Sequence, residues 1–124
     1  MVIKIKDKEY PITIGLGAIN YLDKIYFVES DGVKLGEGIS YLIYYLTQQN
    51  PTALYNFYKA GITTLKQKPS NEDLEGYVED LFKTEKSITK AFEEAMEELK
   101  KSLLIKIKTA TILKTMKMAE NGTL

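Results

Sequence analysis

The sequence lacks both cysteine and histidine, which removes the commonest residues of metal and catalytic chemistry. Without cysteine there is no disulfide framework and no Cys-based zinc site. Without histidine there is neither the usual general base near neutral pH nor the commonest nitrogen ligand for metals. The remaining polar residues form no recognisable catalytic arrangement. The sequence therefore predicts a protein that is not an enzyme, with no catalytic residues, no cofactor and no metal.

Arginine is absent as well, so all seventeen basic residues are lysine, and seventeen acidic residues balance them. Arginine is the preferred residue for bidentate recognition of phosphate and carboxylate groups. A net charge of zero provides no overall field that would attract nucleic acid. The N-terminal residues lack the apolar core of a signal peptide, and no apolar run of about 18 residues could span a bilayer. We therefore expect a cytoplasmic protein.

Length and apolar periodicity predict a mainly α fold of about five helices with a short N-terminal β-hairpin. A chain of 124 residues fits one domain and can bury about two thirds of its unfolded surface. Alternating apolar residues predict the two strands, and a helical period begins after Gly15. In chain order, the expected elements are strands at 2–6 and 10–14, helices at about 16–26 and 33–48, a helix from Pro51, and a helix that follows Ser70.

Two of these helices have recognisable starting residues. Asn50 precedes Pro51, which is typical of an N-cap followed by the first helical position. Ser70 and Asp73 resemble a capping box, with Asp in place of the preferred Glu. Residues 30–32, Ser-Asp-Gly, predict a turn before the helix expected at 33–48.

The last third of the chain has a different character. Residues 84–118 contain neither proline nor glycine, so one helix could cover all of them. Such a helix would be about 50 Å long, whereas a domain of this size is only roughly 35 Å across. The segment is therefore expected to bend back or to project toward a partner, and alternation at 105–108 leaves a strand open. We expect two parts: residues 1–82, with the hairpin and helical core, and residues 83–124, a long helical segment with a basic tail.

Two patterns resemble ligand sites and are better explained without a ligand. Gly15 and Gly17 follow a strand and open a helix, as in a dinucleotide-binding loop, but Asn20 stands at the third glycine position. A tight strand-to-helix turn explains them. The acidic residues within 72–80 and 93–98 lack calcium-loop spacing. We interpret them as first-turn and solvent-facing acids of helices.

Nine tyrosines are more informative than these patterns. Tyr41, Tyr44 and Tyr45 border the apolar stripe of the helix expected at 33–48, and Tyr55 and Tyr58 do the same on the next helix. A helix that is apolar over most of its circumference is central or is covered by another molecule. Tyrosine is also enriched at protein interfaces, so core packing and a partner surface are both open. The stripe itself consists of Leu35, Ile39, Leu42, Ile43 and Leu46.

The basic tail is the strongest local signal. Acidic residues at 93–98 are followed by six lysines, with no further acid until Glu120, and aliphatic residues lie between those lysines. Such a segment suits a membrane surface, nucleic acid or a groove in another protein. The lack of Arg and Trp favours protein contact, with a partner or head-to-tail between copies. The candidate contact residues are Tyr41, Tyr44, Tyr45, Tyr55, Leu103, Leu104, Ile105, Ile107, Ile112, Leu113 and Met116.

Three segments carry a resemblance to a known family. They are GLGAINYLDKIYFVESDGVKLGEG at 15–38, NPTALYNFYKAGI at 50–62 and KPSNEDLEGYVEDL at 68–81. In this order and at these spacings they resemble the tail assembly chaperones of siphovirus-type phages that infect Gram-positive bacteria. None of the three segments is a catalytic motif, so the resemblance is one of overall pattern.

The resemblance implies a role in virion morphogenesis. Such chaperones bind and solubilise the tape measure protein, assist polymerisation of the tail tube protein around it, and are absent from the mature virion. The implied partners are therefore the tape measure protein, the tail tube protein and further copies of the chain, in the host cell cytoplasm. The family has a short form and a longer form made by frameshifting, and this chain resembles the short form.

Two other function classes remain alternatives on the residues alone. A DNA-binding regulatory protein would use the Lys-rich tail to contact phosphates, and its retention on heparin would fall steeply with salt. A peripheral membrane protein would bind liposomes through the same tail. The preferred interpretation, a chaperone of helical clients, expects contact with neither nucleic acid nor membrane.

Overall fold

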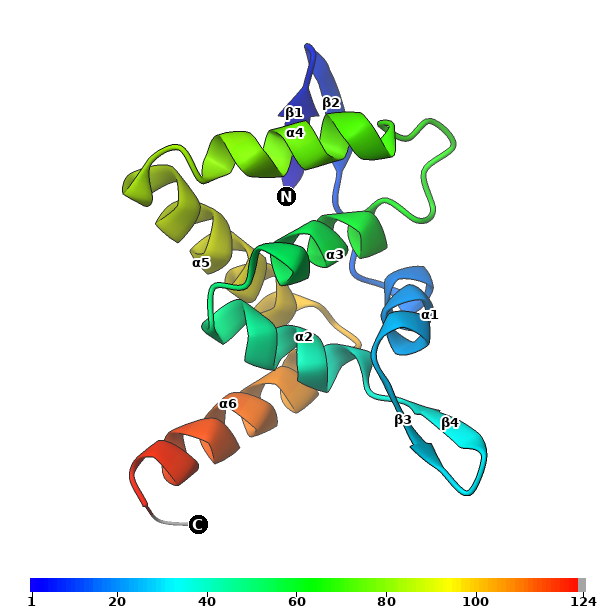
Figure 1. Cartoon of the computed structure of the whole chain (residues 1–124), viewed down its shortest axis with the longest axis vertical. Helices are drawn as coiled ribbons and strands as arrows, with labels where there is room; N and C mark the ends of the chain where they lie inside the picture. Colours follow the sequence, from blue (N-terminus) through cyan, green and yellow to red (C-terminus); the bar gives the residue numbers. More distant parts are fainter. Residues whose placement is uncertain (123–124) are drawn as a thin grey trace.

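The computed structural model describes residues 1–122 as six helices and two β-hairpins (Figure 1). The fold is mainly α with an N-terminal hairpin, as the sequence predicts. In chain order, the elements are β1 (Val2–Ile5), β2 (Lys8–Pro11), α1 (Leu16–Ile25), β3 (Phe27–Ser30), β4 (Val33–Gly36), α2 (Gly38–Thr47), α3 (Pro51–Gly61), α4 (Asn71–Leu81), α5 (Glu85–Lys101) and α6 (Lys106–Glu120).

The N-terminal hairpin is tighter than the sequence predicts. Its turn consists of Lys6 and Asp7, both at positive φ (50° and 64°), and this two-residue geometry suits the twist of paired strands. The second strand therefore begins at Lys8, and its predicted position at 10–14 is wrong. The sequence gives little warning, because neither turn residue is the Gly or Asn usual at such φ values. Ile12 and Ile14 follow the strand and are buried in the core.

A second hairpin, β3–β4, replaces the beginning of the helix expected at 33–48. Its turn is Asp31-Gly32, with φ of 52° and 78°, which is the two-residue turn that Asp-Gly favours. Residues 33–36 form a strand, and α2 begins only at Gly38. Leu35 was expected on the buried side of a helix and is instead 49% exposed. The apolar residues at 35–46 have helical spacing, but the Asp31-Gly32 turn determines the structure of residues 33–36.

Helix α3 lies at the centre of the fold and contacts α1, α2, α4 and α5. Figure 1 shows it crossing the middle of the molecule, with α4 above it and α2 below. Its side chains Leu54, Phe57 and Tyr58 are buried on these neighbours. The predicted cap is confirmed, because the Asn50 side chain accepts a hydrogen bond from Ala53 N at 3.1 Å.

The start of α4 confirms the second predicted cap. The Ser70 hydroxyl accepts a hydrogen bond from Asp73 N at 3.0 Å. Glu72 and Asp73 lie in the first turn, where acidic side chains favour the helix dipole. The buried side of α4 carries Leu74 and Val78.

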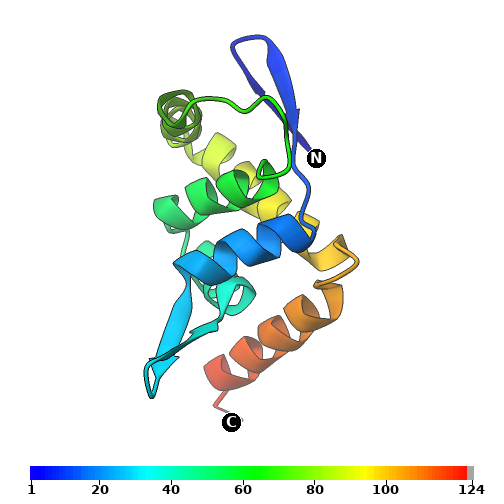
Figure 2. The same ribbon diagram turned by 90° about the vertical axis from the view of Figure 1, so that its right-hand side faces the viewer.

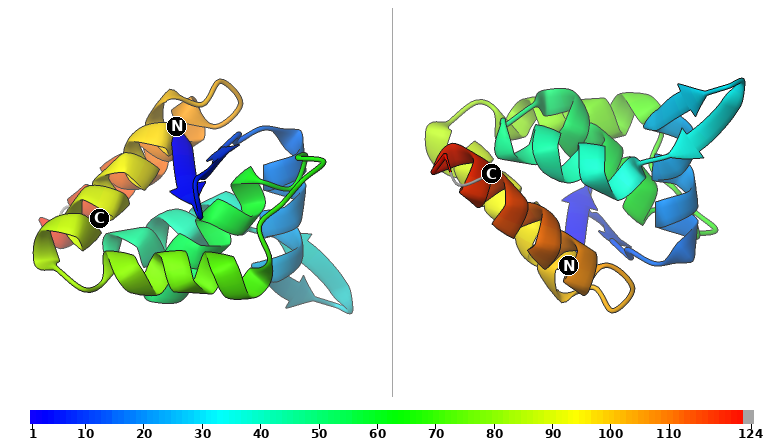
Figure 3. Two further views of the ribbon diagram at one scale, coloured as in Figure 1. Left: turned by 90° about the horizontal axis from the view of Figure 1, so that it is seen from above. Right: turned by 90° about the horizontal axis from the view of Figure 1, so that it is seen from below.

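The C-terminal segment forms two helices instead of one continuous helix or a strand. Helix α5 ends at Lys101, the chain turns, and α6 runs back to contact both α5 and α2. Figures 2 and 3 show α6 beside these two helices at one end of the molecule. The turn buries Ile105, and the first turns of α6 bury Thr109, whose hydroxyl donates to the Leu99 carbonyl at 3.4 Å. Burial of these two side chains therefore holds α6 against the core.

Helices α1 and α2 approach each other closely at Gly38. A Cβ atom at this position would lie 2.6 Å from the Leu22 carbonyl carbon and 2.6 Å from Leu22 Cβ. The Gly38 amide donates to Asp23 Oδ1 at 2.8 Å, which joins the ends of the two helices across the β3–β4 hairpin. Only glycine allows this approach.

We expect Gly38→Ala to lower the free energy of unfolding by about 1–3 kcal/mol, because backbone atoms must move to admit the methyl group. Gly76→Ala is the matched control. Gly76 lies within α4 with no atom within 4 Å of its ideal Cβ position, so alanine should stabilise that helix by about 0.5–1 kcal/mol. Urea unfolding followed by circular dichroism measures both. Equal effects of the two substitutions would contradict the close approach.

Candidate functional site

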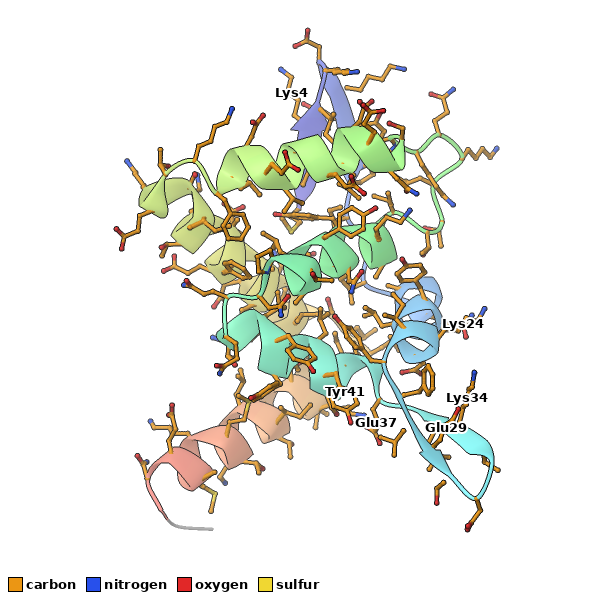
Figure 4. The ribbon with its side chains drawn as sticks, in the orientation of Figure 1. Lys4, Lys24, Glu29, Lys34, Glu37 and Tyr41 are labelled. Atoms are coloured by element: carbon orange, nitrogen blue, oxygen red, sulfur yellow. The ribbon has the colours of Figure 1, made fainter. Side chains whose placement is uncertain are left out.

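Four tyrosine rings form a continuous row along one side of α2. Tyr26 lies 6.1 Å from Tyr41 and 5.9 Å from Tyr45, measured between ring centroids. Tyr41 and Tyr45 are 6.4 Å apart, and Tyr44 follows at 5.3 Å from Tyr45. These distances are within the range of favourable aromatic pairs. We call Tyr26, Tyr41, Tyr45 and Tyr44 the tyrosine row; Figure 4 labels Tyr41, at the end of α2 near the β3–β4 hairpin.

The local sequence explains how the row is presented. Ile39, Leu42, Ile43 and Leu46 occupy one face of α2 and are almost wholly buried, so the tyrosines between them are placed at the helix flanks. Tyr26 is held at the base of β3 because its hydroxyl accepts a hydrogen bond from the Asn56 amide at 3.0 Å. No charged residue occurs from 38 to 58. The row is therefore apolar with polar hydroxyl tips, a composition suited to protein contact.

A groove lies between α2 and α6, next to Tyr44. Its volume is about 690 Å³, within the range of sites that take a bound group. Tyr44, Leu113 and Met116 provide its apolar lining. The full set of lining residues, called here the α2–α6 groove, is Tyr44, Thr47, Gln48, Leu113, Met116, Lys117, Ala119 and Glu120.

The two sides of this groove differ in charge. Helix α2 is uncharged, whereas α6 carries four lysines and one glutamate. Within residues 1–122, none of the α6 lysines has an ion-pair partner. Three of the four lysines of α5, in contrast, pair with acids on the same helix: Lys90 with Glu94 at 3.9 Å, Lys100 with Glu97 at 3.2 Å and Lys101 with Glu98 at 3.3 Å. Along the α6 rim of the groove, Lys114 and Lys117 outnumber Glu120, so the rim carries a net positive charge.

The turn between α5 and α6 exposes a second apolar surface. Leu103 is 80% exposed, Ile107 is 77% exposed, and Leu104 is more than half exposed. We call these three residues the α5–α6 corner. Ile105 lies between them in sequence but is only 3% exposed and belongs to the core. Contiguous exposed apolar side chains are typical of surfaces that bind another protein or a membrane.

The β3–β4 hairpin projects from the body and is exposed along its whole length (Figure 1). Strand pairing places Val28 opposite Leu35 and Ser30 opposite Val33, so Val28, Val33 and Leu35 share one face. The other face carries Phe27 and the Glu29–Lys34 pair, with Lys34 Nζ 4.8 Å from the Phe27 ring centroid. We call the first face the aliphatic face of the hairpin. Figure 4 labels Glu29 and Lys34.

The structure places the residues singled out by the sequence in three settings. Tyr41, Tyr44, Tyr45, Leu113 and Met116 come together at the tyrosine row and the α2–α6 groove, and Leu103, Leu104 and Ile107 form the α5–α6 corner. Ile112 is half-buried against the core.

Two further candidates lie away from these surfaces. Ile105 is buried in the core, and Tyr55 of α3 lies with Glu75 and Val78 of α4. Burial raises the pKa of the Tyr55 hydroxyl above its usual value, and the charge of Glu75 adds to that shift. Tyr55 therefore belongs to a different part of the surface from the tyrosine row.

Sequence reasoning missed the aliphatic face of the hairpin and the place of Tyr26 in the tyrosine row. The signal for the hairpin was present, because Asp31-Gly32 lies between Phe27-Val28 and Val33-Lys34-Leu35. Tyr26 joins the row only through the packing of α1 against α2, which no local pattern reports.

Within residues 1–122, no group of acidic side chains is placed to hold a metal ion. Over the same residues, none of the helices has the length and apolar character needed to cross a bilayer. The surfaces described above consist mainly of tyrosine and aliphatic side chains, and Lys117 and Glu120 are the charged residues in the lining of the groove.

Comparison with known proteins yields one match. The family model described as "Phage tail assembly chaperone protein, TAC" matches residues 2–114, which is nearly the whole chain. Neither the curated proteins nor the solved structures include a match. The matched range covers the tyrosine row, the α5–α6 corner, the hairpin, and the α6 wall of the groove as far as Leu113.

We expect substitution of the buried Ile105 to lower the free energy of unfolding strongly, and substitution of the exposed corner residues to leave it almost unchanged. Ile105→Ala should lower the free energy of unfolding by about 2–5 kcal/mol, because it empties part of the core. Leu103→Ser and Ile107→Ser should change it by no more than about 0.5 kcal/mol, because both side chains are already in solvent. Denaturant unfolding of the three variants measures this. A large loss in Ile107→Ser would show that the corner is packed within the monomer.

Proposed function

The chain belongs to the phage tail assembly chaperone family, and from this premise we propose that it binds and solubilises the tape measure protein. Membership in a chaperone family indicates a non-enzymatic role with protein partners in tail assembly. The observation that carries the finer proposal is the tyrosine row, which continues into the α2–α6 groove. Together they offer an elongated, largely apolar and aromatic surface with charged residues only at the α6 rim, instead of a closed pocket.

The chemistry of this surface suits an elongated helical client. A long chain of apolar helices aggregates unless its apolar faces are covered, and covering them requires a broad surface. Tyrosine contributes a large ring with few rotatable bonds. Met116 adds an unbranched side chain that adapts to different neighbours. A surface of this composition binds many related helices instead of one sequence.

The wider role follows the family. We propose that the protein assists polymerisation of the tail tube protein around the tape measure, acts in the host cytoplasm, and is absent from the finished virion. Binding of many copies along one client would raise the effective concentration of each added copy.

Self-association forms the second part of the proposal, and two uncovered surfaces support it. The β3–β4 hairpin and the turn between α5 and α6 lie on opposite sides of the molecule (Figures 2 and 3). Asp31 in the hairpin turn is acidic, whereas Lys106 and Lys108 next to the corner are basic. A two-stranded hairpin is marginal by itself in water, so a neighbour that covers it adds stability. Contact of hairpin with corner would join copies head to tail.

We expect the double variant Tyr44→Ser/Met116→Ser to reduce the amount of tape measure protein kept soluble on co-expression by about tenfold. Truncation of hot-spot residues near an interface centre weakens binding by about 2 kcal/mol or more, and about 1.4 kcal/mol corresponds to tenfold. Lys86→Ala, at the exposed start of α5, is the control and should leave solubility unchanged. Equal solubility of the tape measure protein without any chaperone would refute the proposed function.

The head-to-tail contact makes a separate prediction. One double variant carries lysines on the hairpin, Val33→Lys/Leu35→Lys, and the other carries them on the corner, Leu103→Lys/Ile107→Lys. Each variant should be monomeric, because formation of the contact would bury two unpaired lysine side chains. An equal mixture of the two variants should form only dimers, since one intact hairpin and one intact corner remain. Light scattering coupled to size exclusion measures the masses.

Val2→Lys serves as the control for this experiment, since Val2 is an exposed valine on the other hairpin. It should associate like the unmodified protein. Extended oligomers in the mixture of the two variants would show that the copies join through different surfaces.

A further inference from the structure

We propose that the α2–α6 groove selects its client helix by charge and takes a helix whose apolar stripe is flanked by acidic residues. This inference rests on the proposed function, because the tape measure protein would provide the helices. It adds a rule of selection that the family match does not contain. It can also fail while the chaperone function stands.

The shape of the groove indicates a helical occupant. On α6 its lining residues are 113, 116, 117 and 120, at i, i+3, i+4 and i+7, and on α2 they are 44, 47 and 48, at i, i+3 and i+4. Residues so spaced lie along one face of each helix. The groove therefore runs for about 10 Å along α6, or two helical turns, and for about 6 Å along α2. An amphipathic helix laid in such a groove buries the side chains of one face.

The lining of the groove requires an apolar stripe on that helix. Leu113 and Met116 are half-buried against the core, and Tyr44 stands beside them with 49% of its surface exposed. A ligand without apolar groups, such as a nucleic acid backbone, would leave this lining uncovered. An apolar stripe that covers it gains free energy in proportion to the area removed from water.

The rim of the groove decides the charge of the flanking residues. Lys117 lines the groove and Lys114 lies one turn before it, and neither has an ion-pair partner within residues 1–122. The α2 side contributes no charge, and Glu120 is the single acid among the lining residues. Acidic residues beside the stripe of a client would therefore meet the ammonium groups of Lys114 and Lys117, which outnumber the single carboxylate of Glu120. Lysines at the same positions would be repelled.

Designed peptides test this inference with the whole chain. One peptide is a helix with leucine at i, i+3, i+4 and i+7 and glutamate at the remaining positions; the second has lysine at every glutamate. Fluorescence anisotropy should show that the acidic peptide binds about tenfold more tightly, since each surface pair contributes up to about 1 kcal/mol. The difference should shrink as salt is added.

Charge reversal on the protein makes the test specific for the groove. Lys114→Glu/Lys117→Glu should reverse the preference, so that the basic peptide binds more tightly. Lys66→Glu/Lys68→Glu changes the net charge equally at exposed positions between α3 and α4, and should keep the original preference. Met116→Ser should weaken binding of both peptides.

Several results would overturn the inference. If the two peptides bind equally tightly, the groove does not select its client by charge. If Lys66→Glu/Lys68→Glu reverses the preference as much as Lys114→Glu/Lys117→Glu does, the preference comes from the net charge of the protein and not from the groove. If neither peptide binds and Lys114→Glu/Lys117→Glu abolishes self-association, the occupant is a second copy of the chain. If neither peptide binds and the tape measure protein is still kept soluble, selection by charge is refuted and the proposed chaperone function is retained.

Discussion

The packing of α6 back onto α2 and α5 is the contact on which the surfaces of this protein depend. Burial of Ile105 and Thr109 fixes where α6 begins and which of its faces turns inward. That placement sets Leu113 and Met116 beside Tyr44 and so forms the groove. The same turn leaves the α5–α6 corner in solvent. One tertiary contact thus determines both the concave apolar surface and a convex one.

The fold places two kinds of exposed surface in separate parts of a small chain. The tyrosine row and the groove provide a broad, uncharged wall with a basic rim, which suits an extended helical client. The hairpin and the turn between α5 and α6 lie on opposite sides of the body (Figure 2), and each exposes aliphatic side chains. A chaperone that coats a long client needs both kinds of surface, one for the client and one for its own copies. The family match and the surfaces therefore lead to one account.

Local signals in the sequence predicted much of the fold, whereas tertiary packing determined the rest. Asn50 and Ser70 cap helices as predicted, since a cap needs only its own neighbours. Asp31-Gly32 indicates the second hairpin, whereas the helical spacing of the apolar residues that follow indicates a helix from residue 33, and the structure forms the hairpin. The sequence contains no Pro or Gly that would predict the break between α5 and α6. It depends on burial of Ile105, which also explains why this candidate is not on the surface.

The most direct test of the central claim is hydrogen exchange of the chaperone, free and bound to the tape measure protein. Backbone amides in covered, ordered segments exchange more slowly than those in open ones. The account predicts new protection concentrated in α2 and α6, with α4 unchanged. Protection of α4 alone, with α2 and α6 exchanging as in the free protein, would contradict it.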